Sequence, residues 1–205
     1  MTKLLVATTN PGKLREYAAI LADLPLELCS LRDLAIDDDV EETGATFAEN
    51  ALLKARYYAT RSGLPAWADD SGLEVAALDG APGVYSARFA GHGASDSDRN
   101  ALLLEKLAGL PFHARLARFV CVVALALPDG TAETVEGALH GVIELAPRGD
   151  GGFGYDPLFY VVDEDRTLAE LPAERKNAIS HRARAAQAAR ELLAQWVDAG
   201  YLSRY

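Results

Sequence analysis

Two pairs of adjacent carboxylates are the residues of this sequence best suited to catalysis. Glu41 and Glu42 stand in an acidic loop, and Asp69 and Asp70 follow a short apolar stretch. Oxygen ligands of this kind suit Mg²⁺, which usually binds one or two carboxylates together with substrate phosphates. Asp-Asp-Ser-Gly is also ordinary turn chemistry, and acidic loops are ordinarily solvated. The two pairs therefore indicate metal-assisted phosphate chemistry only in combination with other signals.

A second stretch carries groups that can hold an anion. It reads Thr8-Thr9-Asn10-Pro11-Gly12-Lys13 and joins a predicted strand to a predicted helix. Hydroxyls, an amide, backbone N–H groups and a lysine can converge on a phosphate here, because helix N-termini attract anions. The G-x-x-x-x-G-K-[ST] spacing of a Walker loop is absent, and an ordinary turn is the alternative interpretation.

Two further stretches suit a nucleobase. In Gly151-Gly152-Phe153-Gly154-Tyr155-Asp156-Pro157, small neighbours leave an aromatic face open for stacking, although an aromatic residue near a strand is more often part of the core. Lys176-Asn177-Ala178-Ile179-Ser180-His181-Arg182 places basic residues at a helix start, where they oppose the helix dipole. An anionic or carbonyl-rich ligand would explain them, and a solvated surface face is the alternative.

Helices that position these stretches are predicted from apolar spacing and capping signals. After Pro11-Gly12, apolar residues recur at i, i+3, i+4 and i+7. Thr46 and Glu49 have capping-box spacing, and Ser180 is the expected cap of the last helix. Helices are expected around residues 14–21, 47–61, 95–107 and 180–200.

The predicted strands are short, apart from one hairpin. Residues 118–127 and 131–139 are joined across Asp129-Gly130, which is a hairpin signal. Other strands are expected at residues 4–7, 26–30, 66–68, 73–75 and 158–162, with a tight turn at Ser71-Gly72. Because the hairpin is antiparallel while helices and strands alternate elsewhere, the predicted class is α/β with a mixed sheet and flanking helices.

Composition narrows the function classes. The chain has 205 residues, of which 50% are hydrophobic and 24% charged, which predicts a globular protein of one domain or a compact pair of lobes. Its formal charge of −10 opposes binding to nucleic acid or to anionic membranes, neither of which is expected as a partner. The longest apolar run, residues 119–127, is far short of the roughly 20 residues of a membrane span.

The remaining signals concern location and redox chemistry. The apolar stretch at the amino terminus is too short for a signal peptide, so a cytoplasmic protein is expected. Cys29 and Cys121 lie far apart in apolar stretches and are expected to be buried thiols. The sequence contains neither a Gly-x-Ser-x-Gly elbow nor a Cys-x-x-Cys pair, so nucleophilic and redox catalysis lack a candidate.

Six stretches, taken in order, resemble the inosine/xanthosine triphosphate pyrophosphatase family. Its members hydrolyse noncanonical purine nucleoside triphosphates and so cleanse the nucleotide pool. One stretch alone would be weak, whereas six in sequence are highly specific and cover nearly the whole chain. They are Ala7-Thr8-Thr9-Asn10-Pro11-Gly12-Lys13, Glu41-Glu42-Thr43-Gly44 with Thr46-Phe47-Ala48-Glu49-Asn50-Ala51, Ala68-Asp69-Asp70-Ser71-Gly72-Leu73, Gly80-Ala81-Pro82-Gly83-Val84-Tyr85-Ser86-Ala87-Arg88, Phe153-Gly154-Tyr155-Asp156-Pro157 and Lys176-Asn177-Ala178-Ile179-Ser180-His181-Arg182.

The resemblance implies roles for the polar residues around the phosphates. Glu41 and Asp70 would hold Mg²⁺, and Asp70 would also accept a proton from the attacking water. Whether Glu41 or Glu42 is the ligand stays open. The triphosphate would be bound by Thr8, Thr9, Asn10, Pro11, Gly12, Lys13, Lys54 and Ser71.

The resemblance also implies a base pocket and a reaction. Phe153 would stack on the base, beside Gly154, while Tyr155 and Asp156 shape the pocket. Its oxygen-bearing edge would be met by Lys176, His181 and Arg182. ITP, dITP or XTP would be hydrolysed to the monophosphate and pyrophosphate, which prevents misincorporation into DNA and RNA.

The fold implied by the resemblance is an elongated, two-lobed single domain over residues 1–205 with a central cleft, usually a homodimer. Two rival functions are weighed against the enzyme. A nucleotide-binding regulatory module would use the same residues without turnover, although two carboxylates near the phosphates argue against it. A pyrophosphatase acting on modified pyrimidine nucleotides would show a different base preference.

Overall fold

One mixed sheet contains all seven strands that the computed structural model describes within residues 2–204. The strand order is β2-β1-β3-β4-β5-β6-β7. β1 is parallel to β2 and β3, whereas β6 is antiparallel to β5 and β7. The strands are β1 (Thr2–Val6), β2 (Leu26–Ser30), β3 (Ala66–Val75), β4 (Leu116–Ala126), β5 (Ala132–Ile143), β6 (Phe159–Val161) and β7 (Arg166–Thr167). The predicted α/β class with a mixed sheet is confirmed.

The longer helices agree with the capping and periodicity signals. Thr46 and Glu49 form the expected capping box at the start of α2, which ends at Gly63 in the left-handed conformation. Ser180 precedes α5, and its Oγ accepts a hydrogen bond from the N–H of Ala183. The α-helices are α1 (Pro11–Ile20), α2 (Phe47–Ser62), α3 (Asp96–Lys106), α4 (Ala173–Ile179) and α5 (His181–Asp198).

The chain divides into two units, each with its own hydrophobic core. The first unit combines residues 2–70, Cys121–Gly137 and 184–204. The second combines Ser71–Val120 and Ala138–Ala183.

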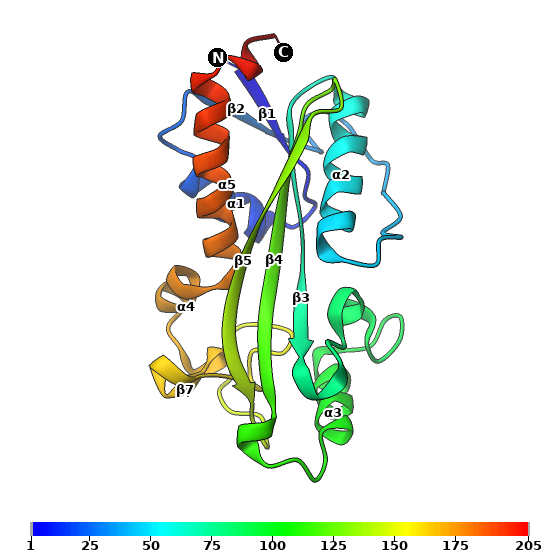
Figure 1. Ribbon diagram of the computed structural model, residues 1–205, viewed down its shortest axis with the longest axis vertical. Coiled ribbons are helices and arrows are strands. Elements are labelled where there is room, and N and C mark those ends of the chain that lie inside the picture. Colours follow the sequence, from blue (N-terminus) through cyan, green and yellow to red (C-terminus); the bar gives the residue numbers. More distant parts are fainter. Residues whose placement is uncertain (1, 205) are drawn as a thin grey trace. The chain divides into compact units, whose positions relative to one another are not determined.

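Helices cover both faces of the sheet in the first unit. Leu4 and Val6 of β1 belong to a core that also contains Tyr17 of α1 and Leu193 of α5. Leu5 is fully buried too, and it points to the opposite face because side chains alternate along a strand. Figure 1 shows α2 on that side of the strands, away from α1 and α5.

The core of the second unit is rich in aromatic residues. Phe119 of β4 and Phe159 of β6 pack with their ring centroids 4.6 Å apart. Leu103 of α3 and Leu107, which caps the end of that helix, belong to the same core. The free cysteines, Cys29 and Cys121, are buried in the first unit, as the sequence predicts.

One local prediction is wrong. The expected turn at Ser71-Gly72 does not exist, because β3 runs without interruption from Ala66 to Val75. The physical reason is that the carboxylates within this strand have partners elsewhere in the chain, so they need no solvated turn. Lys176 precedes the cap Ser180, as the sequence predicts, and it lies in the short helix α4, which the sequence did not predict.

No helix within residues 2–204 is long and apolar enough to cross a membrane.

Candidate active site

The loop between β1 and α1 is shaped by its own side chains. Oδ1 of Asn10 accepts hydrogen bonds from the N–H groups of Gly12 (2.8 Å) and Lys13 (3.3 Å), and so caps α1. The N–H of Asn10 donates to Oγ1 of Thr8 at 3.2 Å. The loop borders a surface cavity of about 630 Å³, to which Thr8, Thr9, Asn10 and Pro11 contribute. The cavity is also lined by Asp37, Asp38 and Asp39, which precede Glu41 and Glu42 in the acidic loop. The predicted phosphate loop is therefore ordered and accessible.

Lys13 forms an ion pair with Asp69, a contact that the sequence did not predict. Its Nζ lies 2.6 Å from Oδ2 of Asp69, whose side chain is 2% exposed. Alternation along β3 buries Asp69 and leaves Asp70 partly exposed, as expected for an extended segment. Asp69 thus positions the lysine that the sequence assigns to the triphosphate.

Asp70 is surrounded by donors from α2. Its Oδ2 accepts a 3.1 Å hydrogen bond from Nδ2 of Asn50, and its Oδ1 lies 3.6 Å from Nζ of Lys54. Lys54 in turn donates a 2.6 Å hydrogen bond to Glu42. Burial alone would lower the pKa of Lys54, but the carboxylates of Asp70 and Glu42 outweigh it and hold that pKa above its ordinary value. The lysine is therefore a firmly charged neighbour of Asp70.

Asn50 also belongs to this cluster, although the sequence motif that contains it suggested no role for it. It is buried, and its Oδ1 also accepts a 2.7 Å hydrogen bond from the N–H of Gly44. One side chain thus joins the end of the acidic loop to Asp70. The signal for such a contact in the sequence is a polar residue on the apolar face of an amphipathic helix, because buried polar groups are hydrogen-bonded.

Of the two glutamates in the acidic loop, Glu42 contacts the cluster of Asn50, Lys54 and Asp70. Glu42 is bound to Lys54, whereas Glu41 is exposed to solvent. Within residues 2–204 there is no group of three or more His, Cys, Asp or Glu side chains arranged to hold a metal ion. Mg²⁺ usually binds one or two carboxylates together with substrate phosphates. Asp70 and one carboxylate of the acidic loop would be such a set of ligands.

The second unit gathers the residues assigned to the base. Phe153 is 61% exposed, and its ring has Nζ of Lys176 at 4.5 Å and Cζ of Arg182 at 5.9 Å from its centroid. Cations at these distances interact favourably with an aromatic face. His181 stacks on Phe119, with centroids 4.8 Å apart and planes inclined by 12°. An exposed ring edged by basic side chains is suited to stacking on an electron-rich base.

Asp156 fixes the position of this ring and of Lys176. The carboxylate is 4% exposed, accepts a 2.8 Å hydrogen bond from the N–H of Phe153, and forms an ion pair with Lys176. Gly152 leaves room for this carboxylate, because a Cβ there would lie 2.1 Å from Oδ2 of Asp156. Asp156 therefore shapes the pocket as an internal anchor.

Tyr155 has a structural position in the same loop. It is buried, and its hydroxyl donates a 2.9 Å hydrogen bond to the carbonyl oxygen of Ser86. Burial, as the largest cause, raises the pKa of Tyr155 to about 12. The phenol is thus neutral near pH 7 and supports the loop from within.

The structure assembles the candidates into two clusters, one in each unit. The first holds the phosphate loop, the acidic loop, Lys54 and Asp70, and the second holds Phe153 to Asp156 with Lys176, His181 and Arg182. Ser71 is the next residue of β3 after Asp70 and is partly buried.

Comparison with known proteins supports the resemblance found in the sequence. A sequence profile of the Ham1 family matches residues 4–192. A protein from Geobacter sulfurreducens named dITP/XTP pyrophosphatase is 59% identical over 185 residues, which are 90% of this chain and 93% of that protein. One of the same name from Streptomyces coelicolor is 54% identical over 94% of this chain and 100% of its own length.

Solved structures show the same fold. A HAM1 protein from Coxiella burnetii superposes with a TM-score of 0.90 at 44% identity, over 95% of this chain and 100% of that one. The Ham1 protein of Staphylococcus aureus gives a TM-score of 0.88 at 41% identity, over 94% of this chain and 98% of that one.

Proposed function

The chain belongs to the Ham1 family, and from this premise we propose that it is a nucleoside triphosphate pyrophosphatase acting on noncanonical purine nucleotides. Its substrates are ITP, dITP and XTP, and its products are the nucleoside monophosphate and pyrophosphate. The observation that carries the proposal is the arrangement of Asp70 between Asn50 and Lys54, in a chain 59% identical to a relative named dITP/XTP pyrophosphatase.

Asp70 accepts the proton of the attacking water. The ammonium group of Lys54 lies 3.6 Å from its Oδ1, and an ionised carboxylate is the form that can accept a proton. The amide of Asn50 donates to one carboxylate oxygen and so orients the group. Lys54 also contributes positive charge toward the phosphates.

Because Glu42 is already bound to Lys54, a magnesium ion would be held by the exposed Glu41 and by Asp70, together with substrate phosphates. When bound, such an ion neutralises phosphate charge and lowers the pKa of water. Glu42 is the alternative ligand. Since it accepts a hydrogen bond from Lys54, we assign it the positioning of that lysine instead.

The triphosphate binds to the loop from Thr8 to Lys13, with Ser71 as a further contact. Thr8 and Thr9 offer hydroxyl groups, and Lys13 offers a charge whose position Asp69 sets. Two of the N–H groups at the start of α1 already bind Asn10, so hydroxyl and ammonium groups are the principal donors.

The base is bound by residues of the second unit. Phe153 stacks on it, and His181, Arg182 and Lys176 present donors to a 6-oxo group. A 6-amino group would leave these donors unpaired, which costs about 1 to 3 kcal/mol each. This accounts for preference of inosine and xanthine over adenine.

Further parts of the proposal concern the cell and the assembly. The protein acts in the cytoplasm as one domain in a homodimer, and its reaction keeps noncanonical purines out of DNA and RNA. The high identity with relatives named dITP/XTP pyrophosphatase, over nearly their whole length, supports a common activity.

A substrate panel tests the proposal. ITP, dITP and XTP are compared with ATP, GTP and modified pyrimidine triphosphates, with Mg²⁺ added or chelated, and Asp70→Asn serves as the control. We expect pyrophosphate and a monophosphate from the first three and loss of turnover on chelation. Orthophosphate as the first product would contradict the assignment. Tight nucleotide binding without turnover would favour a regulatory module, and turnover confined to pyrimidines would identify the other rival.

A further inference from the structure

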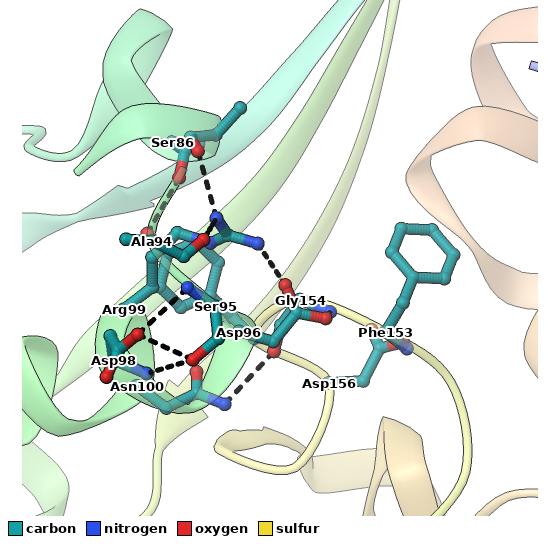
Figure 2. Close-up of polar contacts among 12 residues, drawn as sticks. Ser86, Ala94, Ser95, Asp96, Asp98, Arg99, Asn100, Phe153, Gly154 and Asp156 are labelled. Atoms are coloured by element: carbon teal, nitrogen blue, oxygen red, sulfur yellow. Dashed lines mark hydrogen bonds and ion pairs between the residues drawn. The ribbon is translucent and has the colours of Figure 1, made fainter. Parts of the chain in front are cut away.

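Helix α3 contacts the loop that carries Phe153, although none of the sequence motifs assigned it a role in the site. Figure 2 shows these contacts. Oδ2 of Asp96 accepts a 2.7 Å hydrogen bond from the N–H of Gly154. Nδ2 of Asn100 donates a 3.0 Å hydrogen bond to the carbonyl oxygen of the same residue. Both backbone groups of one loop glycine are therefore bound by one helix.

The spacing of these two residues explains how they reach one glycine. Asp96 and Asn100 stand four positions apart on α3 and therefore project from the same face. Asn100 is buried, and its Oδ1 has no hydrogen-bond partner among the described residues. Among the described residues, the side-chain amide of Asn100 therefore forms its hydrogen bond with Gly154, through Nδ2.

Arg99 fixes the orientation of Asp96. Its guanidinium forms an ion pair with Oδ1 of Asp96 and donates hydrogen bonds to the carbonyl oxygens of Ala87 (3.0 Å) and Ala94 (2.7 Å). A planar guanidinium with several bound donors has little freedom to rotate. We call Asp96, Arg99 and Asn100 the Gly154 clamp.

The clamp completes the support of Phe153. Asp156 binds the N–H of Phe153 from one side, and Asp96 binds the next N–H, that of Gly154. Two successive backbone amides are thus held by two different carboxylates. The ring of Phe153, which is largely exposed, points away from both (Figure 2). Its backbone is fixed while its side chain remains largely exposed to solvent.

We propose that the Gly154 clamp positions Phe153 for stacking on the base, and so sets the affinity of the enzyme for its nucleotide. The inference rests on the proposed function, in which Phe153 binds the base. Asp96, Arg99 and Asn100 are positioning residues that act through the backbone of Gly154. Loss of a stacking surface weakens binding of the ground state and the transition state alike, so KM rises while kcat is maintained.

Asp96→Ala and Asp98→Ala are a matched pair that tests this inference. Each removes one carboxylate from the first turn of α3. Among residues 2–204, however, the side chain of Asp98 accepts hydrogen bonds only from the N–H and hydroxyl of Ser95. For Asp96→Ala we expect KM for ITP to rise at least about fivefold with kcat within about twofold of wild type. For Asp98→Ala we expect wild-type KM. Asp96→Asn keeps an oxygen for the N–H of Gly154 and should restore most of the affinity.

Amide hydrogen exchange gives a readout that does not depend on activity. In the wild-type protein the N–H of Gly154 should exchange at least about tenfold more slowly than an unprotected amide, and Asp96→Ala should abolish this protection. Should Asp96→Ala fail to fold, Asn100→Ser replaces it and its KM is interpreted in the same way. An unprotected Gly154 in the wild type, or equal KM values in the matched pair, would overturn the inference. Absence of ITP hydrolysis by the wild type would instead contradict the proposed function.

Discussion

Lys13 of α1 and Asp69 of β3 form an ion pair in which Nζ and Oδ2 are 2.6 Å apart. The carboxylate is almost completely buried, whereas the lysine side chain is 20% exposed. A buried charge is costly without its partner, so the pair determines where the lysine lies. Asp69 therefore influences the phosphate loop from inside the fold.

Asp69→Asn and Asp70→Asn should have opposite signatures, although the two residues are adjacent. Asp70→Asn should lower kcat by roughly 10²- to 10⁴-fold, as expected for loss of a general base, while the protein folds. Asp69→Asn should cost about 1 to 3 kcal/mol of stability and affect kcat less. ITP hydrolysis with excess Mg²⁺ and thermal melts measure both effects. An active Asp70→Asn enzyme, or an equally inactive but fully stable Asp69→Asn enzyme, would reverse the assignment.

Glu41→Gln and Glu42→Gln separate a metal ligand from a residue that positions Lys54. Glu41→Gln should raise the Mg²⁺ concentration for half-maximal activity at least about tenfold. Glu42→Gln removes the charge that faces Lys54 and should mainly raise KM for ITP. Magnesium titrations at saturating ITP, followed by ITP titrations at saturating Mg²⁺, measure the two constants. If the two variants exchange these signatures, Glu42 is the ligand.

Gly152→Ala and Gly154→Ala compare two glycines with positive φ, at +75° and +63°. An added Cβ at Gly154 meets nothing within 4 Å, so only the backbone cost of about 1 to 2 kcal/mol applies. At Gly152 the Cβ would also collide with Asp156, which should displace the partner of Lys176 and add roughly 1 to 3 kcal/mol. Urea unfolding provides the comparison. Equal free energies of unfolding for the two variants would show that the loop accommodates the Cβ at Gly152 without loss of stability.

Tyr155→Phe should change the dependence of stability on pH. The pKa of Tyr155 is raised from 10.0 to about 12, so the folded protein retains the phenolic proton longer than the unfolded chain. This contribution to stability is fully present below pH 10 and is lost as the pH rises to about 12. The variant should lose about 1 kcal/mol at pH 7, with the hydrogen bond to Ser86, and decline less between pH 10 and 12. Denaturant unfolding at several pH values measures the slope, and an unchanged slope would contradict the expectation.

Arg182→Ala should reduce selectivity more than turnover. Removing the guanidinium takes away a donor for a 6-oxo group but leaves Phe153 in place, so the ratio of kcat/KM for ITP over ATP should fall by roughly 5- to 150-fold. Phe153→Ala is the control, because loss of stacking should weaken both nucleotides. An unchanged ratio in Arg182→Ala would exclude this arginine as a source of selectivity.

Much of the fold could be predicted because the signals are local. The capping box of Thr46 and Glu49 identifies the start of α2, and the hairpin turn at Asp129-Gly130 identifies two neighbouring strands. Helix α4 was not predicted as a helix, because it has seven residues, too few for apolar periodicity to appear.

What the sequence could not predict depends on partners far along the chain. Asp-Asp-Ser-Gly suggests a turn, yet Lys13 and Asn50 stabilise the carboxylates within a strand, at separations of 56 and 20 residues. Glu41 and Glu42 are adjacent in a loop without periodicity, so only the structure shows that Glu42 binds Lys54. The role of Asp96 depends on a contact with Gly154, 58 residues away.

The double contact of Asn50 affects the entropy of binding. By joining the N–H of Gly44 to Asp70, it restricts the acidic loop and the carboxylate at the same time. The rotational freedom of these groups is therefore lost when the protein folds, rather than when the nucleotide arrives. In the proposed function, a substrate would meet groups that are already ordered, so more of its interaction energy would be available to favour the transition state. Asn50 would thus connect the speed of the proposed reaction to the order of the unliganded protein.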